Sequence, residues 1–196
     1  NYKERIEEIN HLFDKAWAYS NSTDNSIDIK LESMLGLFDG STTLFIHSNK
    51  ANDMRDAIKF AKKYSIKKTV LVGAEDALKI INILKKENIS LILKRVHRLP
   101  ITQDRHIDEP YSQAKKLHNE GVLFCLSYDG DMEAMGSRNL PFTAGTTVAY
   151  GQEYEDAVMS ISLNAAKILG IDHMVGSIEK GKDATFFISS GDALDI

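Results

Sequence analysis

Cysteine, proline and long apolar runs are all scarce in this sequence. One cysteine and three prolines occur among 196 residues, and because Cys125 stands alone no internal disulfide can form. No apolar run approaches the ~20 residues that span a bilayer, so no membrane partner is expected. The chain begins Asn-Tyr-Lys rather than with Met and an apolar segment. We therefore expect no signal peptide in this stretch and a piece of a longer protein, and the cellular compartment stays open.

Basic residues are not in excess either. Lys and Arg total 24 against 28 Asp and Glu, which gives a formal net charge of −4, and no basic block occurs. Because neutralising phosphates requires clustered Lys and Arg, no nucleic-acid partner is expected. A hydrophobic content of 43% and a charged content of 27% are those of an ordinary globular protein. They exclude a disordered tail, a collagen-like chain and a disulfide scaffold.

Four short apolar runs follow one another from residue 42 onward, and turn residues bound each of them. They lie at 42–47, 68–73, 89–96 and 122–127 and are rich in β-branched and large apolar side chains. Such nearly continuous apolar runs are typical of strands covered on both faces. Their starts near residues 42, 69, 90 and 122 are 21 to 32 residues apart. This spacing is that of β–α repeats and predicts parallel strands joined by right-handed crossovers.

Helical periodicity fills the segments between and around these runs. Apolar residues recur at helical spacing over 54–61 and 77–84, and Glu109-Pro110 starts a third helix that ends at Gly121. Two more helices are expected within residues 2–37, and residues 139–170 are expected to be helical as well. Residues 175–188 have the pattern of a hairpin with a Gly-containing turn.

The number of strands leaves two architectures open. Four parallel strands form either an open sheet or half of an eight-stranded barrel, and a half barrel has two edges of unpaired backbone groups. We expect a second copy of the chain to cover those edges, which predicts a homo-oligomer.

Two residues at strand ends are candidates for chemistry, because ligands gather at the carboxyl ends of parallel strands. His47 ends the first strand, where a neutral imidazole suits Zn²⁺ or Fe²⁺, although most histidines in such places are structural. Asp129 follows the fourth strand, where a carboxylate can bind a metal and accept a proton from bound water. The sequence Asp129-Gly-Asp131 is equally typical of a turn. One His and one Asp are fewer than the three ligands that a metal site needs.

The other polar residues near strand ends have structural interpretations. Glu75 and Asp76 are expected to cap the helix that follows them. His97 and Arg98 are expected in a solvated loop, with contact to a substrate carboxylate as the alternative. Cys125 lies within a strand and is expected to pack.

The C-terminal part of the chain resembles the signature of a known superfamily. Residues 164–171 read Asn-Ala-Ala-Lys-Ile-Leu-Gly-Ile, and residues 175–184 read Val-Gly-Ser-Ile-Glu-Lys-Gly-Lys-Asp-Ala. They resemble a helix and the return strand of a small β-sandwich in the amidohydrolase superfamily, with Thr185 where that family usually has Asp. Residues 139–151 look like the imidazolonepropionase-related branch.

The resemblance implies the C-terminal half of a TIM (β/α)8 barrel, an α/β fold. Residues 1–172 would form the half barrel with its N-terminal helices, and residues 173–196 would form strands of a β-sandwich. The partner of this chain would then be the N-terminal half of the same barrel, and the chain alone would lack turnover because half of the metal shell is missing.

The resemblance also implies an activity, namely hydrolysis of non-peptide amide C–N bonds in a small-molecule substrate by a metal-activated water. The cofactor would be a divalent metal, zinc or iron. His47 matches a metal-ligand histidine at the end of the fifth barrel strand. Asp129 matches the catalytic aspartate at the end of the eighth strand, which is both a metal ligand and a proton shuttle.

Departures from the family pattern keep other interpretations in play. The sixth barrel strand, where many members place a His, here ends in Gly73-Ala74-Glu75, and the His-x-His of the first strand is absent from this chain. The missing sixth-strand histidine and Thr185 favour a degenerate, non-catalytic binding module of the same fold. A third interpretation is a small open-sheet α/β binding domain, which predicts covered sheet edges and a monomer.

Overall fold

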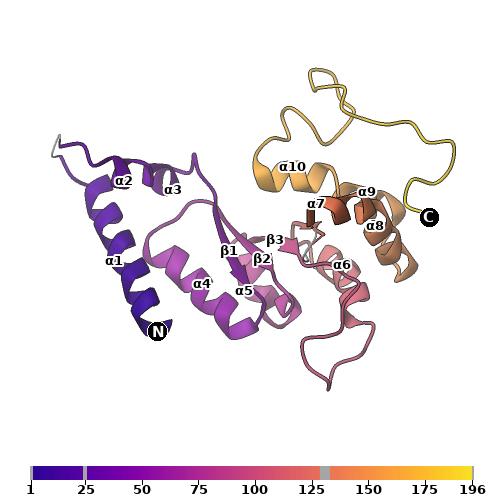
Figure 1. The fold of residues 1–196 in the computed structure, drawn as a ribbon, viewed down its shortest axis with the longest axis horizontal. Helices are drawn as coiled ribbons and strands as arrows, with labels where there is room; N and C mark the ends of the chain where they lie inside the picture. The colour runs from indigo at the N-terminus through magenta and orange to yellow at the C-terminus, as the bar shows by residue number, and fades with distance from the viewer. Residues whose placement is uncertain (1, 24–25, 129–132, 196) are drawn as a thin grey trace.

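Four parallel strands form the centre of the computed structural model, which describes residues 2–23, 26–128 and 133–195 (Figure 1). The strands are β1 (Leu44–Ser48), β2 (Thr69–Gly73), β3 (Ser90–Leu93) and β4 (Phe124–Leu126). They pair in the order β1-β2-β3-β4, and every pairing is parallel. The strands and their direction expected from the apolar runs are therefore confirmed.

Helices connect the strands and extend the chain at both ends. Before the sheet come α1 (Tyr2–Ser20), α2 (Ile29–Glu32) and α3 (Leu35–Asp39), and the connections between strands hold α4 (Ala51–Lys63), η1 (Ala77–Ile80), α5 (Ile81–Lys86) and α6 (Glu109–Asn119). After β4 come α7 (Glu133–Gly136), η2 (Ser137–Asn139), α8 (Leu140–Ala149), α9 (Tyr154–Ser160) and α10 (Leu163–Leu169). The helix expected over 77–84 begins as a 3-10 turn and continues as an α-helix.

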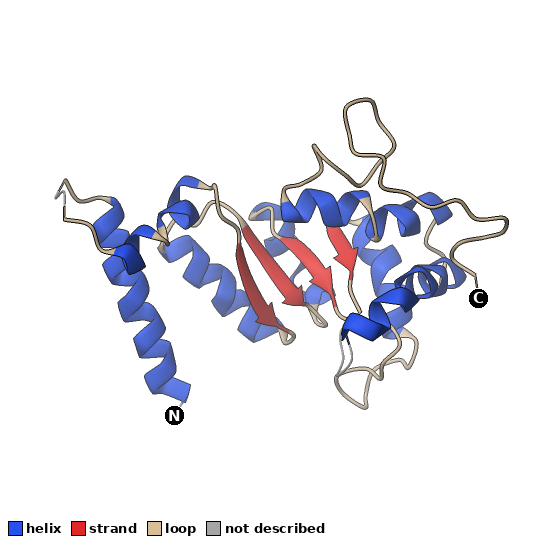
Figure 2. Ribbon diagram, turned by 45° about the horizontal axis from the view of Figure 1, so that its top comes forward, coloured by secondary structure: helices blue, strands red, loops and turns tan. Residues whose placement is uncertain are grey.

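One face of the sheet packs against the connecting helices and forms the main core. Leu71, Leu91 and Leu93 are almost fully buried there and belong to the same cluster as Met54 of α4 and Leu117 of α6. Figure 2 shows these helices behind the strands, with the arrowheads of all four strands toward one edge. The connecting helices thus cover one face of the sheet, as they do in β–α repeats.

The other face of the sheet is covered unevenly. At β4 and β2 it meets α10, where Val70, Cys125 and Ile168 form a small buried cluster. At β1 it stays open, since Phe45 is 39% exposed and His47 is exposed as well. All three residues of β4 are buried, and α8, α9 and α10 pack against that strand. Of the two outer strands of the sheet, β1 is therefore the one whose side chains on this face remain exposed.

The N-terminal helices form a separate apolar cluster at the β1 side of the molecule. Phe13 of α1 and Phe38 of α3 are buried with Tyr64, which follows α4. The Phe13 ring meets Phe60 edge-on with the centroids 4.8 Å apart. Tyr64 Oη donates to Asp14 Oδ1 at 2.8 Å. These contacts fix α1 against α4.

The hairpin expected over 175–188 is not formed in this structure, and the assignment of residues 173–196 to a β-sandwich stays a prediction. The described residues from 173 to 195 contain no strand, and Asp183 N–H donates across the segment to Met174 O at 2.8 Å. An isolated pair of strands is marginally stable in water, and the described chain offers no second sheet for such a pair to join. The side chains of Ile178, Phe187 and Ile188 are consequently 72–90% exposed.

The molecule has more surface than a compact monomer of its size. Its accessible surface is 12308 Å², whereas a compact folded monomer of this mass exposes about 9,300 Å². The two termini lie at opposite ends of the molecule (Figure 1). Within the described part of the chain, no helix combines the length and the apolar character that crossing a bilayer requires.

Candidate functional site at the carboxyl edge of the sheet

His47 lies where the sheet topology brings the ends of all four strands to one edge. The side chain of Ile46 packs into the main core, so by strand alternation His47 and Phe45 face the other side. The register pairs His47 with Val72, Val72 with Ile92, and Ile92 with Cys125. His47 thus belongs to a row of residues on the open face, one residue from the end of its strand.

Asp129, the second predicted site residue, lies outside the described residues. The described chain reaches Ser127 and Tyr128, which leave β4 at the same edge as His47. β1 and β4 are three strand positions apart, which is about 14 Å in a flat sheet. A metal bound by both side chains therefore requires a strongly curved sheet, as in a barrel.

Asp76 joins three segments at this edge. Its side chain is 9% exposed, and Oδ2 accepts from the backbone N–H of Ala51 at 3.0 Å. Oδ1 pairs with Arg105, whose Nη1 donates to Glu109 Oε1 at 2.9 Å. Burial tends to raise the pKa of Asp76, but the hydrogen bonds from Arg105 and Ala51 prevail and hold that pKa below its usual value. Asp76 makes no side-chain cap bond to η1; it caps α4 instead, so the predicted cap is corrected.

Glu75 also pairs across the edge rather than capping the next helix. Its carboxylate lies 2.7 Å from Arg98 Nη1 and 3.7 Å from Lys94 Nζ. The Arg98 side chain is 14% exposed, and burial lowers the pKa of its guanidinium against the attraction of Glu75. Arg98 is therefore not in a solvated loop, contrary to the prediction. His97, which is exposed, donates to or accepts from Thr146 Oγ1 at 2.8 Å.

Gly73 ends β2, the strand that the family resemblance identifies with the sixth barrel strand. Its φ is +97°, and a Cβ at this position would collide with Asn49 Oδ1. Only glycine combines that backbone conformation with such a close approach at low cost. A side chain at position 73 would therefore be strained by the backbone conformation and would require Asn49 to shift.

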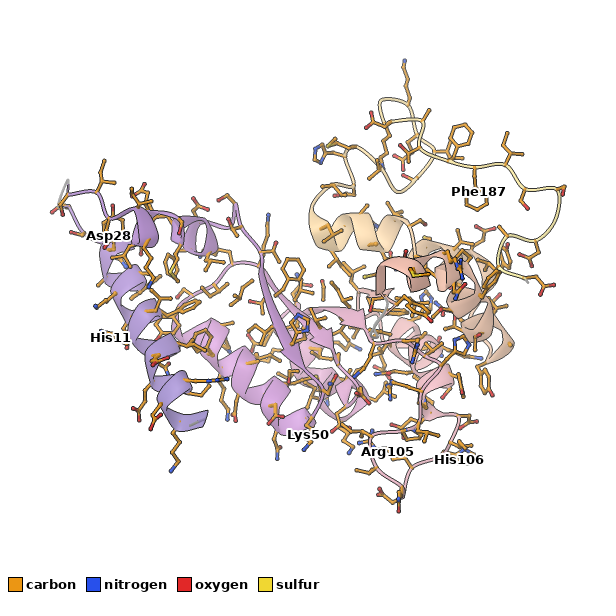
Figure 3. The ribbon with its side chains drawn as sticks, in the orientation of Figure 1. His11, Asp28, Lys50, Arg105, His106 and Phe187 are labelled. Atoms are coloured by element: carbon orange, nitrogen blue, oxygen red, sulfur yellow. The ribbon has the colours of Figure 1, made fainter. Side chains whose placement is uncertain are left out.

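Arg95 and Tyr128 form a cation–π pair near the carboxyl edge of the sheet. Arg95 Nη1 donates to Tyr128 Oη at 3.3 Å, and the guanidinium lies 5.3 Å from the ring centroid. This hydrogen bond holds the pKa of Tyr128 below its usual value. The ring also lies against Gly136, where a Cβ would overlap it. Figure 3 labels Lys50, Arg105 and His106, which lie on loops at the bottom of that view.

The donors around His47 suit one part of a metal shell. Within the ranges that the structure describes, no three His, Cys, Asp or Glu side chains gather as a metal site. Asn49 Oδ1 is nevertheless buried without a hydrogen-bond partner, two residues from the His47 imidazole. A neutral imidazole suits Zn²⁺ or Fe²⁺, so His47 is able to supply one ligand. Cys125 offers no ligand, because burial raises the pKa of its thiol to about 12; it packs, as predicted.

A separate pocket of about 350 Å³ lies between α8 and the C-terminal segment. His97 and Thr146 line it together with Tyr154, whose Oη donates to Asp192 Oδ1 at 2.7 Å. Leu194 is buried against Gly145 at the same place. Its lining includes His97, for which contact with a substrate carboxylate was the alternative, but not His47.

Two interactions at the edge escaped the sequence analysis. Lys94 is 19 positions from its partner Glu75, and Arg105 is 29 positions from its partner Asp76. The pairing of Arg105 left no local signal. The face on which Lys94 lies could have been predicted, because Lys94 continues the alternation in which Leu91 and Leu93 face one side and Ile92 the other.

Solved structures resemble this fold. The crystal structure of an amidohydrolase from Thermotoga maritima superposes with a TM-score of 0.73 at 24% identity and covers 93% of this chain and 52% of that one. A Xaa-Pro dipeptidase crystallised with bound methionine gives a TM-score of 0.55 at 17% identity over 79% of this chain and 40% of that one. Both likenesses concern the fold.

Two imidazolonepropionases are similar to this chain in sequence. An imidazolonepropionase of Phocaeicola vulgatus is 30% identical over 95 residues, which is 48% of this chain and 23% of that protein. An imidazolonepropionase of Thermoplasma volcanium is 28% identical over 150 residues, 74% of this chain and 34% of that protein. The chain therefore aligns with a quarter to a third of these relatives.

The open parallel sheet is in keeping with half of the barrel expected for the superfamily. The family model for the amidohydrolase family matches residues 31–195, which include all four strands and the helices after them. The resemblance noted in the C-terminal signature thus extends over most of the sequence, and the chain belongs to the amidohydrolase family.

Proposed function

We propose that this chain is the C-terminal half of a metal-dependent hydrolase that cleaves non-peptide amide C–N bonds in a small molecule, as an imidazolonepropionase-like enzyme. The observation that carries the proposal is the position of His47 on the open face of a parallel sheet, at its carboxyl edge. Active sites of β–α barrels lie at this edge.

The register of the sheet supports a shared site for His47 and Asp129. In an eight-stranded barrel with a shear of 8, each step to the next strand moves the residue at a given height by about one position. His47 is in register with Cys125, three strands away. Three positions beyond Cys125 is Tyr128, the last described residue before Asp129.

His47 and Asp129 would hold the metal together with ligands from the N-terminal half of the barrel. When bound, a divalent zinc or iron ion lowers the pKa of a water molecule toward ~7 and so supplies a nucleophile. Asp129 would accept the proton of the attacking water and deliver it to the leaving nitrogen as the C–N bond breaks. The chain by itself would not turn over, because the described residues offer too few ligands for a metal shell.

The proposal is tested with the full-length protein that contains these residues. A panel of cyclic and linear amides, including imidazolonepropionate, is assayed with the wild-type protein and with Asp129→Asn. We expect hydrolysis by the wild type and a loss of kcat of about 100-fold or more in the variant, since general acid–base groups contribute 10²–10⁴-fold. His118→Ala is the control, because His118 pairs with Asp156 on the helical layer. Equal activity of the Asp129 variant and wild type would refute the role of Asp129.

A non-catalytic binding module of the same fold is the second candidate. The glycine at the end of β2 favours it, because a side chain at position 73 would be strained and would collide with Asn49, so this position supplies no polar group to the site. A full-length protein that binds no metal and hydrolyses none of the amides would support this alternative.

A further inference from the structure

Lys94 directly follows β3, and strand alternation places it on the same face of the sheet as His47. The backbone N–H of Lys94 donates to Gly73 O at 3.1 Å, so the ladder of β3 continues through this residue. Leu91 and Leu93 point into the main core and Ile92 to the opposite face, and Lys94 therefore follows Ile92. Ile92 is in register with His47 two strands away. In a barrel with a shear of 8, a shift of one position per strand would bring Lys94 to the height of His47.

The Lys94 ammonium is held by a carboxylate that is itself fixed. Its Nζ lies 3.7 Å from Glu75 Oε1, and the side chain of Lys94 is 35% exposed while that of Glu75 is 9% exposed. Glu75 is held in turn by Arg98 Nη1 at 2.7 Å. Arg98 Nη2 also reaches Gln113 Oε1 at 3.4 Å, and Gln113 Nε2 donates to Ala74 O at 2.9 Å. A cation on such a support is oriented before any ligand arrives.

The neighbouring strand end offers no competing group from position 73. Gly73 cannot carry a side chain without striking Asn49. Between the strand of His47 and the segment that leads to Asp129, Lys94 is thus a cation on the open face. We infer that Lys94 donates a hydrogen bond to the amide oxygen of the substrate and stabilises the negative charge that this oxygen acquires, an inference that rests on the proposed function.

The step balances without a further reactant. As the water oxygen bonds to the amide carbon, the π electron pair of the carbonyl moves onto its oxygen, and the proton of the water passes to Asp129. Lys94 keeps its own proton throughout and lowers the energy of the oxyanion by a charge-assisted hydrogen bond. When the tetrahedral centre collapses, the C–N bond breaks and Asp129 protonates the nitrogen.

Two measurements on the full-length protein test this inference. The first is kcat and KM for amide hydrolysis, where Lys94→Gln is expected to lower kcat about 100-fold with a much smaller change in KM, since an oxyanion donor acts in the transition state. The second is calorimetric binding of inorganic phosphate, a tetrahedral oxyanion, whose affinity should fall about 10-fold or more, because hydrogen bonds to charged groups are worth about 1.5–3 kcal/mol. Lys94→Arg, which keeps the charge, should recover part of both.

Lys79→Gln is the matched control. Lys79 also lies beside a carboxylate, with Nζ 3.4 Å from Asp76 Oδ1, but it belongs to η1 on the helix side. Its variant should bind phosphate like the wild type, and equal urea midpoints show that the variants fold. A Lys94→Gln protein with wild-type phosphate affinity would overturn the inference. If phosphate binding depends on Lys94 but no amide is hydrolysed, the proposed function fails while the oxyanion contact stands.

Discussion

At the scale of single residues, buried charges decide how the carboxyl edge is held. The Asp76 carboxylate and the Arg105 guanidinium are each 9% exposed. Removing one partner of such a pair leaves an uncompensated buried charge, which is far costlier than losing a surface ion pair. Asp76 also accepts from the first backbone N–H of α4, so it secures the segment directly after His47.

The pKa of Asp76 predicts a pH dependence of stability. Because the folded pKa lies below the ordinary value of 3.8, the folded state binds fewer protons than the unfolded state in this range. The stabilisation by Asp76 is therefore complete above that ordinary value and is lost as the pH falls through the folded pKa.

Asp76→Asn should accordingly lower the free energy of unfolding by about 3 kcal/mol at pH 7, since it uncouples a buried ion pair. The difference from wild type, measured by urea denaturation, should shrink as the pH is lowered below 4. Asp56→Asn is the control, because Asp56 forms an exposed pair with Lys59. A difference that stays constant between pH 7 and pH 3 would contradict the assigned charge interaction.

These residue contacts also show where the sequence was insufficient. Asp76 was expected to cap a helix, and it does cap one, but that helix is α4 rather than the adjacent η1. The parallel pairing of β1 with β2 brings the start of α4 next to Asp76. Arg105 is 29 positions from Asp76, and no local pattern encodes such a pairing.

At the scale of elements, packing outside the sheet fixes the N-terminal helix. Phe13 is 8% exposed and contacts both Phe60 and Tyr64, with ring centroids at 4.8 and 5.3 Å. By contrast Ile9, on the same helix, is 45% exposed. The position of α1 is therefore expected to depend more on the buried Phe13 than on exposed apolar residues such as Ile9.

Phe13→Ala should lower the free energy of unfolding by about 3–5 kcal/mol, the usual cost of deleting a buried aromatic ring. Ile9→Ala should change it by less than about 1 kcal/mol, because a large part of that side chain is already in water. Urea denaturation followed by circular dichroism measures both. Equal effects of the two substitutions would show that α1 does not dock through Phe13.

The contrast between β1–β4 and residues 175–188 explains which elements were predictable. The four strands were found because each apolar run is buried by neighbours within this chain. The hairpin was expected from an equally good pattern, yet Phe186 and Ile188 remain 60% and 90% exposed. A strand pattern specifies a strand only where a partner sheet is available.

At the scale of the whole molecule, surface area is the distinctive property. The accessible surface of 12308 Å² exceeds the expectation for a compact monomer by about 3,000 Å². Obligate interfaces bury roughly 2,000–5,000 Å² over both partners, or about 1,000–2,500 Å² on each, so the excess is at least as large as the surface that one such interface covers on one chain. The exposed side chains of β1 and of the C-terminal segment belong to this excess.

We therefore expect the 196-residue chain to associate in solution. Light scattering coupled to size-exclusion chromatography should give a mass of at least twice 21.9 kDa. Phe45→Lys places a charge on the open face of β1 and should weaken the association, whereas Lys59→Glu on the exposed surface of α4 should not. A stable monomer at all concentrations would argue against an unsatisfied sheet edge.

The central proposal is that His47 and Asp129 bind one metal ion, and the metal content of the full-length protein tests it most directly. Zinc and iron are quantified per chain in the wild type, His47→Ala, Asp129→Asn and the control His118→Ala. We expect a bound ion in the wild type and the control and its loss in both site variants, with all four proteins folded. Unchanged occupancy after the His47 and Asp129 substitutions would contradict the proposal.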